Sequence, residues 1–230
     1  MPSALDSFSP VSRKETLGSL VREQLRSAIM AGRFAPGEKL TIRAVAAALD
    51  VSLTPAREAL FNLVAEGALE STPNGRVYIP EMDERRIVEI TKIRSRLEGL
   101  AAREAAVRLD DGAIAAITAI NDALIAADRR KDHESLRLLN WQFHFAIYRA
   151  AEMPQLTRMI EGCWLMIGSY LNVIYPKYGE IDAGIRNHLE IIRAMQARDP
   201  ERLSAAVRTD IELASQCLLD MIRSQTADGA

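Results

Sequence analysis

The segment from Val51 to Gly67 carries the periodicity that most constrains how this chain can fold. Apolar residues recur there at the i, i+3, i+4, i+7 and i+8 spacing of a helix with one buried face, namely Ala56, Ala59, Leu60, Leu63 and Val64. Thr54 is the expected N-cap, and Pro55 suits the first turn, where its missing N–H is not needed. The opposite face carries Thr54, Arg57, Phe61 and Asn62. Because a helix N-terminus favours phosphate and arginine pairs bidentately with guanine, this helix is a candidate for entering a DNA major groove.

The neighbouring segments predict a winged helix-turn-helix. Upstream, residues 17–29 have the periodicity of an amphipathic helix, and Thr41 can cap a second, short helix over 41–49. Downstream, two β-rich runs within 68–79 flank the dipeptide Asn74-Gly75, which indicates a hairpin. Three helices followed by a hairpin form a winged helix, with the hairpin as the wing.

After Pro80 the strand signals vanish and long amphipathic helices follow. They are expected over roughly 83–108, 111–130, 133–152, 154–175, 180–197 and 200–225. The fold class is therefore mostly α, in a chain of 230 residues that has room for two domains. The expected parts are a disordered tail at 1–13, a winged helix at 14–80, a linker at 81–84 and an all-α bundle of about six helices at 85–225.

The charge of the chain limits how it could bind DNA. Its formal net charge is −2, and residues 1–80 hold nine Lys and Arg against eight Asp and Glu. A nearly neutral winged helix cannot bind DNA tightly through bulk attraction, so it needs local clusters of arginine and two copies acting together. We therefore expect a homodimer on a two-fold double-stranded DNA site.

Targeting and redox features are sparse. Residues 1–14 lack the apolar core of a secretory signal, and the longest apolar run is too short to span a bilayer. The two cysteines, Cys163 and Cys217, give no disulfide framework. We expect a cytoplasmic protein without a membrane partner.

Polar residues interrupt the apolar stripes of four predicted helices, and these interruptions are the candidate functional positions. They are Arg94 and Glu98 in the first, Asn140 and His144 in the third, His188 in the fifth and Asp210 in the sixth. Buried polar groups need partners, so residues from separate helices are expected to satisfy one another, a metal or a ligand in the bundle core.

A purely structural interpretation stays open for each of these residues. A histidine on an apolar stripe is more often a hydrogen-bonded core residue than a metal ligand. Arg94 and Glu98 can equally be a partly buried ion pair that braces two helices.

Residues 17–79 resemble the DNA-binding domain of the GntR family of bacterial transcription regulators. The matching positions are Leu25-Arg-Ser-Ala-Ile29, Gly32, Pro36-Gly37, Leu40, Val45-Ala46, Leu49, Val51-Ser52, Thr54-Pro55, Arg57-Glu-Ala-Leu60, Leu63 and Glu66-Gly67. The resemblance implies that the following residues lie against DNA: Arg43, Ser52, Leu53, Thr54, Arg57, Asn74 and Gly75. Arg57 is the candidate for base readout, whereas Arg43 and Ser52 are expected to hold the DNA backbone. Leu53 stands where family members often have arginine, which implies an apolar contact, such as one to a thymine methyl group, in place of a charged one.

Residues 85–222 resemble the FCD-type effector domain of the FadR branch of that family. The matching segments are Ile93-Arg94 with Leu97-Glu98, Asn140-x-x-Phe143-His144, and His188-Leu189-x-x-Ile192 with the Ala205-Ala206 helix. Many such domains hold a divalent metal, and the ligands implied here are Asn140, His144, His188 and Asp210. Asn140 replaces the family's usual Asp and Asp210 its usual His. Two imidazoles with oxygen ligands suit zinc, nickel or manganese.

The leading hypothesis is a DNA-binding regulator, most simply a repressor, controlled by a small carboxylate effector that Arg94 and Glu98 help to bind. One alternative keeps the DNA binding but makes the helical domain only a dimerisation module. Another is a metal-dependent hydrolase that uses His144, His188 and Asp210, although it lacks a separate general base other than Glu98 and leaves the winged helix unexplained. We therefore expect that the chain is not an enzyme.

Overall fold

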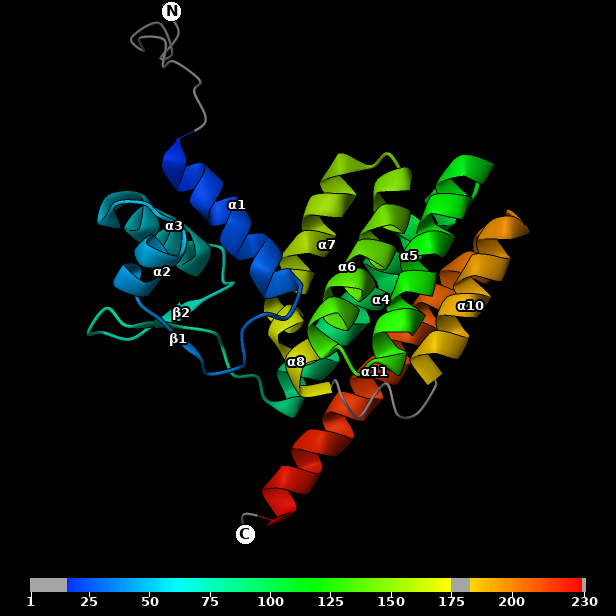
Figure 1. Ribbon diagram of the computed structural model, residues 1–230. Helices are drawn as coiled ribbons and strands as arrows, with labels where there is room; N and C mark the ends of the chain where they lie inside the picture. The colour runs from blue at the N-terminus through cyan, green and yellow to red at the C-terminus, as the bar shows by residue number, and fades with distance from the viewer. Residues whose placement is uncertain (1–15, 175–182, 229–230) are drawn as a thin grey trace, which may run out of the picture.

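The computed structural model describes residues 16–174 and 183–228, so the expected tail at 1–13 lies outside the described residues. A winged helix and a larger helical bundle lie side by side (Figure 1). None of the described helices combines the length and the apolar character that crossing a membrane requires.

The winged helix contains the three predicted helices and a small sheet. Its elements are α1 (Leu17–Met30), β1 (Lys39–Leu40), α2 (Ile42–Ala48), α3 (Leu53–Ala65), β2 (Glu70–Ser71) and β3 (Val77–Tyr78). The hairpin of β2 and β3 forms as predicted, but the sheet has a third strand, β1, in the order β1-β3-β2. Its pairing places Leu40 opposite Val77, and both side chains are buried. A strand of two residues is too short to show alternation in a sequence.

One predicted helix cap is correct and one is wrong. Thr41 caps α2, since its Oγ1 accepts a hydrogen bond of 3.1 Å from the Ala44 N–H. Thr54 does not cap α3, because the helix already begins at Leu53 and Ser52 occupies the N-cap position. The turn before α3 is tight: Asp50 has a φ of 51°, which lets the chain reverse within a few residues and start the helix earlier.

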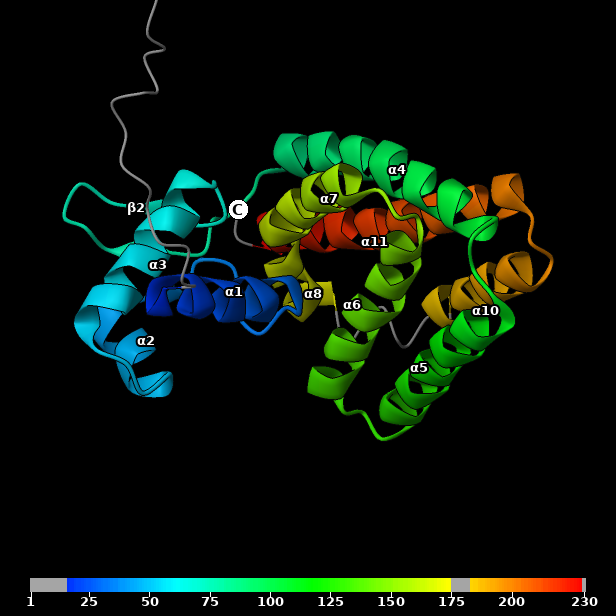
Figure 2. The ribbon, with the colours of Figure 1, turned by 90° about the horizontal axis from the view of Figure 1, so that it is seen from above.

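The bundle contains the predicted succession of helices. They are α4 (Glu84–Ala106), α5 (Asp111–Arg129), α6 (His133–Ala150), α7 (Pro154–Ile167), the 3₁₀ turn η2 (Gly168–Tyr170), α8 (Leu171–Ile174), α10 (Ala183–Gln196) and α11 (Pro200–Asp228). Asp83, Asp110 and Asp132 cap the first three by accepting hydrogen bonds from backbone N–H groups three residues on. Helices α4 and α11 run alongside each other, as Figure 2 shows from above.

The helix expected over 154–175 is interrupted, which corrects the prediction. It breaks at Gly168, where the backbone packs against the end of α1. A β-carbon on Gly168 would collide with the carbonyl oxygen of Ile29 and the backbone of Met30. On the other side, Gly32 has a φ of 65°, and a β-carbon there would lie 2.9 Å from the Gly168 carbonyl oxygen. The two glycines permit the close approach between the winged helix and the bundle.

Candidate functional site

The predicted DNA-contacting side of α3 faces away from the protein. Ala56, Ala59, Leu60 and Leu63 are fully buried against the winged-helix core. That burial directs Thr54 and Arg57 outward, where both are exposed. Leu53 is 48% exposed, which leaves its side chain available for an apolar contact.

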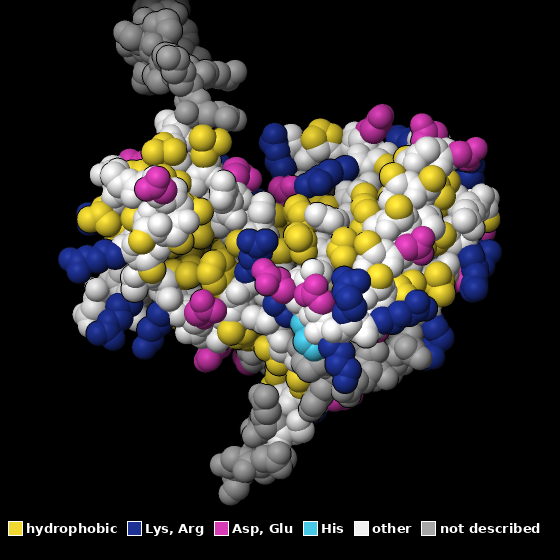
Figure 3. Space-filling view, in the orientation of Figure 1, with side chains coloured by type: hydrophobic (Ala, Val, Ile, Leu, Met, Phe, Trp, Pro, Cys, Tyr) yellow, Lys and Arg dark blue, Asp and Glu magenta, His cyan; other side chains and the backbone are white. Residues whose placement is uncertain are grey.

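The residues of the wing and of α2 that were predicted to contact DNA are exposed as well. The wing turns at Gly75, whose φ is 73° and whose N–H donates to the Thr72 carbonyl oxygen at 2.9 Å. All the residues predicted to touch DNA are exposed, namely Arg43, Ser52, Leu53, Thr54, Arg57, Asn74 and Gly75. Lys and Arg side chains gather at the outer edge of the winged helix (Figure 3). These Lys and Arg side chains give the winged helix a local positive charge, which a nearly neutral domain needs if it is to bind DNA.

The two histidines and the aspartate that the sequence singled out meet inside the bundle. His144 of α6 places its Nε2 3.2 Å from Oδ2 of Asp210 in α11, and His188 of α10 places its Nε2 3.8 Å from Oδ1 of the same carboxylate. One ligand atom from each of the three lies within 4.8 Å of the other two. All three residues are buried. The imidazole rings stand 5.2 Å apart at 83° to each other.

The other ring nitrogens of the two histidines also have partners. His144 Nδ1 lies 3.2 Å from the Tyr148 hydroxyl, and His188 Nδ1 lies 3.1 Å from Oδ1 of Asn121. Both partners are fully buried. Imidazoles held at one nitrogen in this way keep a fixed orientation for the other.

Asn140 is the fourth predicted ligand, and it does not join these contacts. It is buried on α6 one turn before His144, but no described hydrogen bond links its amide to the cluster. The amide that does reach the carboxylate belongs to Asn187, which donates to Asp210 at 3.2 Å and to the Ala206 carbonyl oxygen at 3.0 Å. A metal contact by Asn140 stays a prediction.

The Arg94–Glu98 pair is joined to the histidines by one hydroxyl. Arg94 Nε donates to Glu98 Oε1 at 2.6 Å, and Arg94 Nη2 donates to Oε2 at 3.3 Å. The Tyr148 hydroxyl also donates to Glu98 Oε2, at 2.6 Å. The guanidinium lies over the Trp164 ring, 4.8 Å from its centre. A buried polar chain thus runs from Arg94 through Glu98 and Tyr148 to His144.

Burial dominates the electrostatics at the histidine end of this chain. It lowers the pKa of His188 to about 4, a shift that the charge of His144 reinforces and that of Asp210 opposes. Burial also opposes ionisation of Asp210, but contacts with His144, His188 and Asn187 outweigh it and lower the pKa of Asp210. The cluster therefore presents a carboxylate to a neutral His188.

At the other end, Arg94 keeps its charge. Burial alone would lower the pKa of Arg94, but the charge and hydrogen bonds of Glu98 outweigh it and raise the pKa. Burial and the neighbouring Glu98 carboxylate raise the pKa of Tyr148 well above its usual value. The Tyr148 hydroxyl therefore keeps its proton.

The donor set fits a divalent metal. Two imidazole nitrogens and a carboxylate converge, and each histidine is hydrogen-bonded at its second nitrogen, as metal-bound histidines are. Two buried N–H groups near the cluster lack acceptors among the described residues, namely the Asn121 amide and the Trp164 indole. Buried donors without partners are costly, so they fit a site that receives an acceptor-rich ligand.

Sequence reasoning missed four residues of this site: Asn121, Tyr148, Trp164 and Asn187. Asn121 could have been found, because it interrupts the stripe of Ile114, Ile117 and Leu124 as the chosen residues interrupt theirs. Asn187 likewise interrupts the stripe of Ile191 and Ala194, whereas Tyr148 and Trp164 follow normal helical patterns and only their neighbours in space give them a role.

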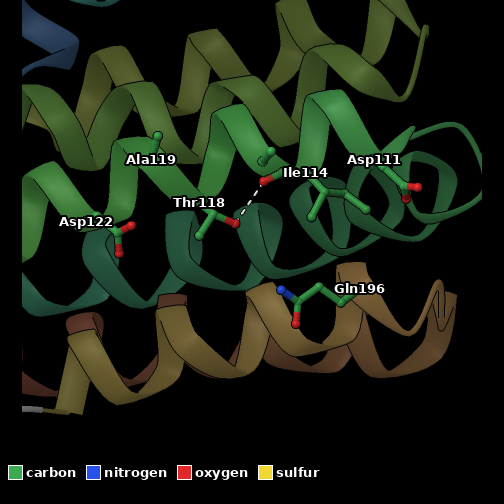
Figure 4. Close-up of a pocket in the computed structure, with 7 residues that line it drawn as sticks. Asp111, Ile114, Thr118, Ala119, Asp122 and Gln196 are labelled. Atoms are coloured by element: carbon green, nitrogen blue, oxygen red, sulfur yellow. Dashed lines mark hydrogen bonds between the residues drawn. The ribbon is translucent and has the colours of Figure 1, made fainter.

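A separate groove of about 470 Å³ lies between α5 and α10, as Figure 4 shows. Its polar groups are already engaged in part: the Thr118 hydroxyl donates to the Ile114 carbonyl oxygen, and Asp111 pairs with Arg198 at 2.8 Å. None of the predicted site residues lines it. The buried cluster is therefore the better candidate site.

Comparison with known proteins agrees with the two-part fold. Residues 17–79 match the bacterial regulatory proteins of the gntR family, and residues 89–213 match the FCD domain. The HTH-type transcriptional regulator McbR of Escherichia coli (strain K12) is 32% identical over 185 residues, which cover 79% of this chain and 83% of McbR. The chain belongs to the GntR family.

Two further comparisons agree with this assignment. The structure of E. coli McbR/YncC superposes with a TM-score of 0.84 at 29% identity, covering 91% of this chain and all of that chain (100%). A probable D-xylose utilization operon transcriptional repressor of Paenarthrobacter nicotinovorans is 30% identical over 86% of each chain. Our protein is thus a transcription regulator with a GntR winged helix and an FCD domain, in a family whose members bind operator DNA, usually as dimers.

Proposed function

We propose that this regulator binds operator DNA as a homodimer and represses transcription until a small carboxylate effector binds in the helical domain. The observation that carries the proposal is the convergence of His144, His188 and Asp210 in one buried network with Arg94. An all-structural core has no need of three ionisable residues within 4.8 Å of one another.

Arg57 reads bases in this proposal, and Arg43 and Ser52 position the DNA backbone. Thr54, Asn74 and Gly75 complete the contacts, with Leu53 against an apolar base edge. Their exposure on one domain supports these roles.

Dimerisation through α4 is supported by an apolar stripe on its surface. Ile93 and Leu100 of α4 are 43% and 42% exposed, and Val107 at the C-cap of the helix is 65% exposed, so that the three recur every seven residues. A heptad spacing places side chains along one seam of a helix, where a second copy can cover them.

His144, His188 and Asp210 would hold the metal, with Asn140 as the fourth ligand. A divalent ion such as zinc, nickel or manganese supplies a positive centre with open positions for effector oxygens. The carboxylate of the effector would also meet Arg94, whose Nη1 makes no described hydrogen bond while Nε and Nη2 hold Glu98. Glu98 is fully buried, so its part is to orient Arg94 instead of touching the effector.

Helix α7 can transmit binding to the DNA-binding domain. It carries Trp164 beneath Arg94, and one turn earlier Glu161 pairs with Arg26 of α1 at 3.3 Å. Arg26 also pairs with Glu66 at the end of α3. A displacement of α7 on effector binding would therefore shift α1 and α3 together.

One observation favours a second candidate function. Asp210 already has contacts with both histidines and with Asn187, so the polar residues partly satisfy one another. In that case the helical domain serves only for dimerisation, and DNA binding is independent of metal and effector.

Fluorescence anisotropy on the regulator's own promoter DNA separates the two. We expect metal-loaded protein to bind, and a panel of small carboxylates to include one that weakens binding at least tenfold, about 1.4 kcal/mol of coupling. The His144→Ala variant should bind DNA but lose that response. If the affinity for DNA does not change when chelator, zinc or any of the acids is added, the helical domain serves only for dimerisation.

A further inference from the structure

The hydroxyl proton of Tyr148 is used in the hydrogen bond to Glu98. The Tyr148 hydroxyl donates to Glu98 Oε2, with 2.6 Å between the two oxygens, and Arg94 donates to the same carboxyl group. Since a tyrosine carries a single O–H, the proton that Tyr148 donates to Glu98 is not available to His144.

The direction of the next hydrogen bond follows. The contact between His144 Nδ1 and the Tyr148 oxygen is 3.2 Å, so Nδ1 must carry the proton and Tyr148 must accept it. At His188 the partner atom is the Asn121 amide oxygen, which also only accepts, at 3.1 Å from Nδ1. Both histidines are therefore protonated at Nδ1.

The consequence appears at the opposite nitrogens. Whenever an imidazole that is protonated at Nδ1 carries no second proton, its lone pair lies on Nε2. In His144 and His188 that atom faces the Asp210 carboxylate, at 3.2 and 3.8 Å. Two lone pairs and a carboxylate repel unless a proton or a metal ion lies among them, so the cluster is arranged for a cation.

We propose that Tyr148 and Asn121 are positioning residues that hold His144 and His188 as Nδ1–H tautomers, so that both Nε2 atoms are ready to bind a divalent metal beside Asp210. Glu98 determines the direction of the hydrogen bond at Tyr148 and so links this site to Arg94. The inference rests on the proposed metal site, and it assigns roles to two residues that are not themselves ligands.

The first experiment needs no variant. The chain has three histidines, so long-range ¹H–¹⁵N spectra of metal-free protein labelled in histidine resolve each ring, and His133→Gln identifies the remaining one. We expect Nδ1 to be protonated in both His144 and His188, and zinc to shift the Nε2 signals of both. An unprotonated Nδ1 in either ring would overturn the inference.

The second experiment measures zinc affinity by competition with a chromophoric chelator. Tyr148→Phe and Asn121→Leu should each weaken zinc binding about 10–100-fold, as loss of partners behind metal ligands does elsewhere. Tyr170→Phe is the matched control, because its buried hydroxyl contacts the Met82 N–H away from the cluster. It should stay within twofold of the wild type.

The outcomes distinguish the inference from the proposed function. If both rings are protonated at Nδ1 but zinc does not bind, the proposed metal fails and the tautomer assignment stands. If zinc binds equally well to Tyr148→Phe, Asn121→Leu and the wild type, the metal site stands and the inference is wrong.

Discussion

Among individual residues, His188 shows how burial selects a charge state. Its ring is stacked on Phe143, with centres 4.2 Å apart, and faces both Asp210 and His144. Because desolvation outweighs the attraction of Asp210, the folded protein holds His188 neutral at pH values where a solvent-exposed histidine takes up a proton.

This makes the stability of the metal-free protein depend on pH. The folded-state pKa of His188 is about 4, below the ordinary value of 6.5, so between these values the unfolded chain binds more protons. Stability from this group is full above pH 6.5 and falls on acidification, with a slope of up to about 1.4 kcal/mol per pH unit. Urea unfolding at pH 7, 6 and 5 should show this slope, and His188→Gln should flatten it. An equal slope in the variant would contradict the assignment.

Arg57 offers a test of base readout. Arg57→Ala should weaken operator binding by about 1–3 kcal/mol and relax discrimination at the base pair it contacts. Anisotropy titrations against operator and single-base variants measure both effects. Arg130→Ala removes an exposed arginine from the end of α5 and should leave binding unchanged. If Arg57→Ala and Arg130→Ala change operator affinity and base discrimination by the same amount, Arg57 contributes only to the net positive charge of the protein.

Among the elements, α7 differs most from the regular helix that its sequence predicts. Its periodicity continues past Ile167, but the backbone tightens at Gly168 where α1 meets it. The break is thus imposed by the approach of another element.

Two glycines of α7 and η2 make a matched pair for testing this. Gly168→Ala should destabilise the protein by about 1–3 kcal/mol, because its β-carbon would collide with the end of α1. At Gly162 nothing lies within 4 Å of an added β-carbon, so Gly162→Ala should be neutral or stabilise by up to about 1 kcal/mol. Thermal and urea melts measure both. A Gly168→Ala protein as stable as the wild type would show that the close approach is not required.

In the whole molecule, the two domains share a contact that combines charge with close packing. Arg26 lies between Glu66 of its own domain and Glu161 of the bundle, and only 14% of its side chain is exposed. Partly buried pairs of this kind are screened less than surface pairs.

We expect Glu161→Gln to loosen the winged helix without unfolding the bundle. The free energy of local opening at α1 should fall by about 1 kcal/mol, because Arg26 loses the one of its three charged partners that belongs to the bundle. Hydrogen exchange of the α1 amides measures this opening. Glu89→Gln, at an exposed position of α4, should change neither domain. If hydrogen exchange of the α1 amides is unaltered in Glu161→Gln, the Arg26–Glu161 pair does not couple the helical domain to the winged helix.

The dimer can be tested along the α4 stripe. Leu100→Glu places a charge in the middle of the proposed seam and should shift the protein from dimer to monomer, with weaker operator binding as a result. Light scattering after gel filtration measures the mass. Met159→Glu is the control, since Met159 is 60% exposed on α7. A dimer that survives Leu100→Glu would place the interface elsewhere.

The sequence alone determined the features that depend on residues close in the chain. The buried stripe of α3, the aspartate caps of α4 to α6 and the hairpin at Asn74-Gly75 follow from local spacing, and the fold class was predicted correctly from them. The family was predicted correctly from the resemblance of its motifs. Interrupted stripes also identified His144, His188 and Asp210, because a polar residue on an inward face is recognisable from one helix.

Only the tertiary structure decided what those residues meet. The pairing of β1 with β3, the break at Gly168 and the hydrogen bonds of Tyr148 and Asn121 all join segments or side chains whose relation no local pattern records. Periodicity reports which face of a helix is buried, since that depends on backbone geometry within a few turns. The partner of each buried atom depends on how separate helices pack, and that is a property of the assembled core.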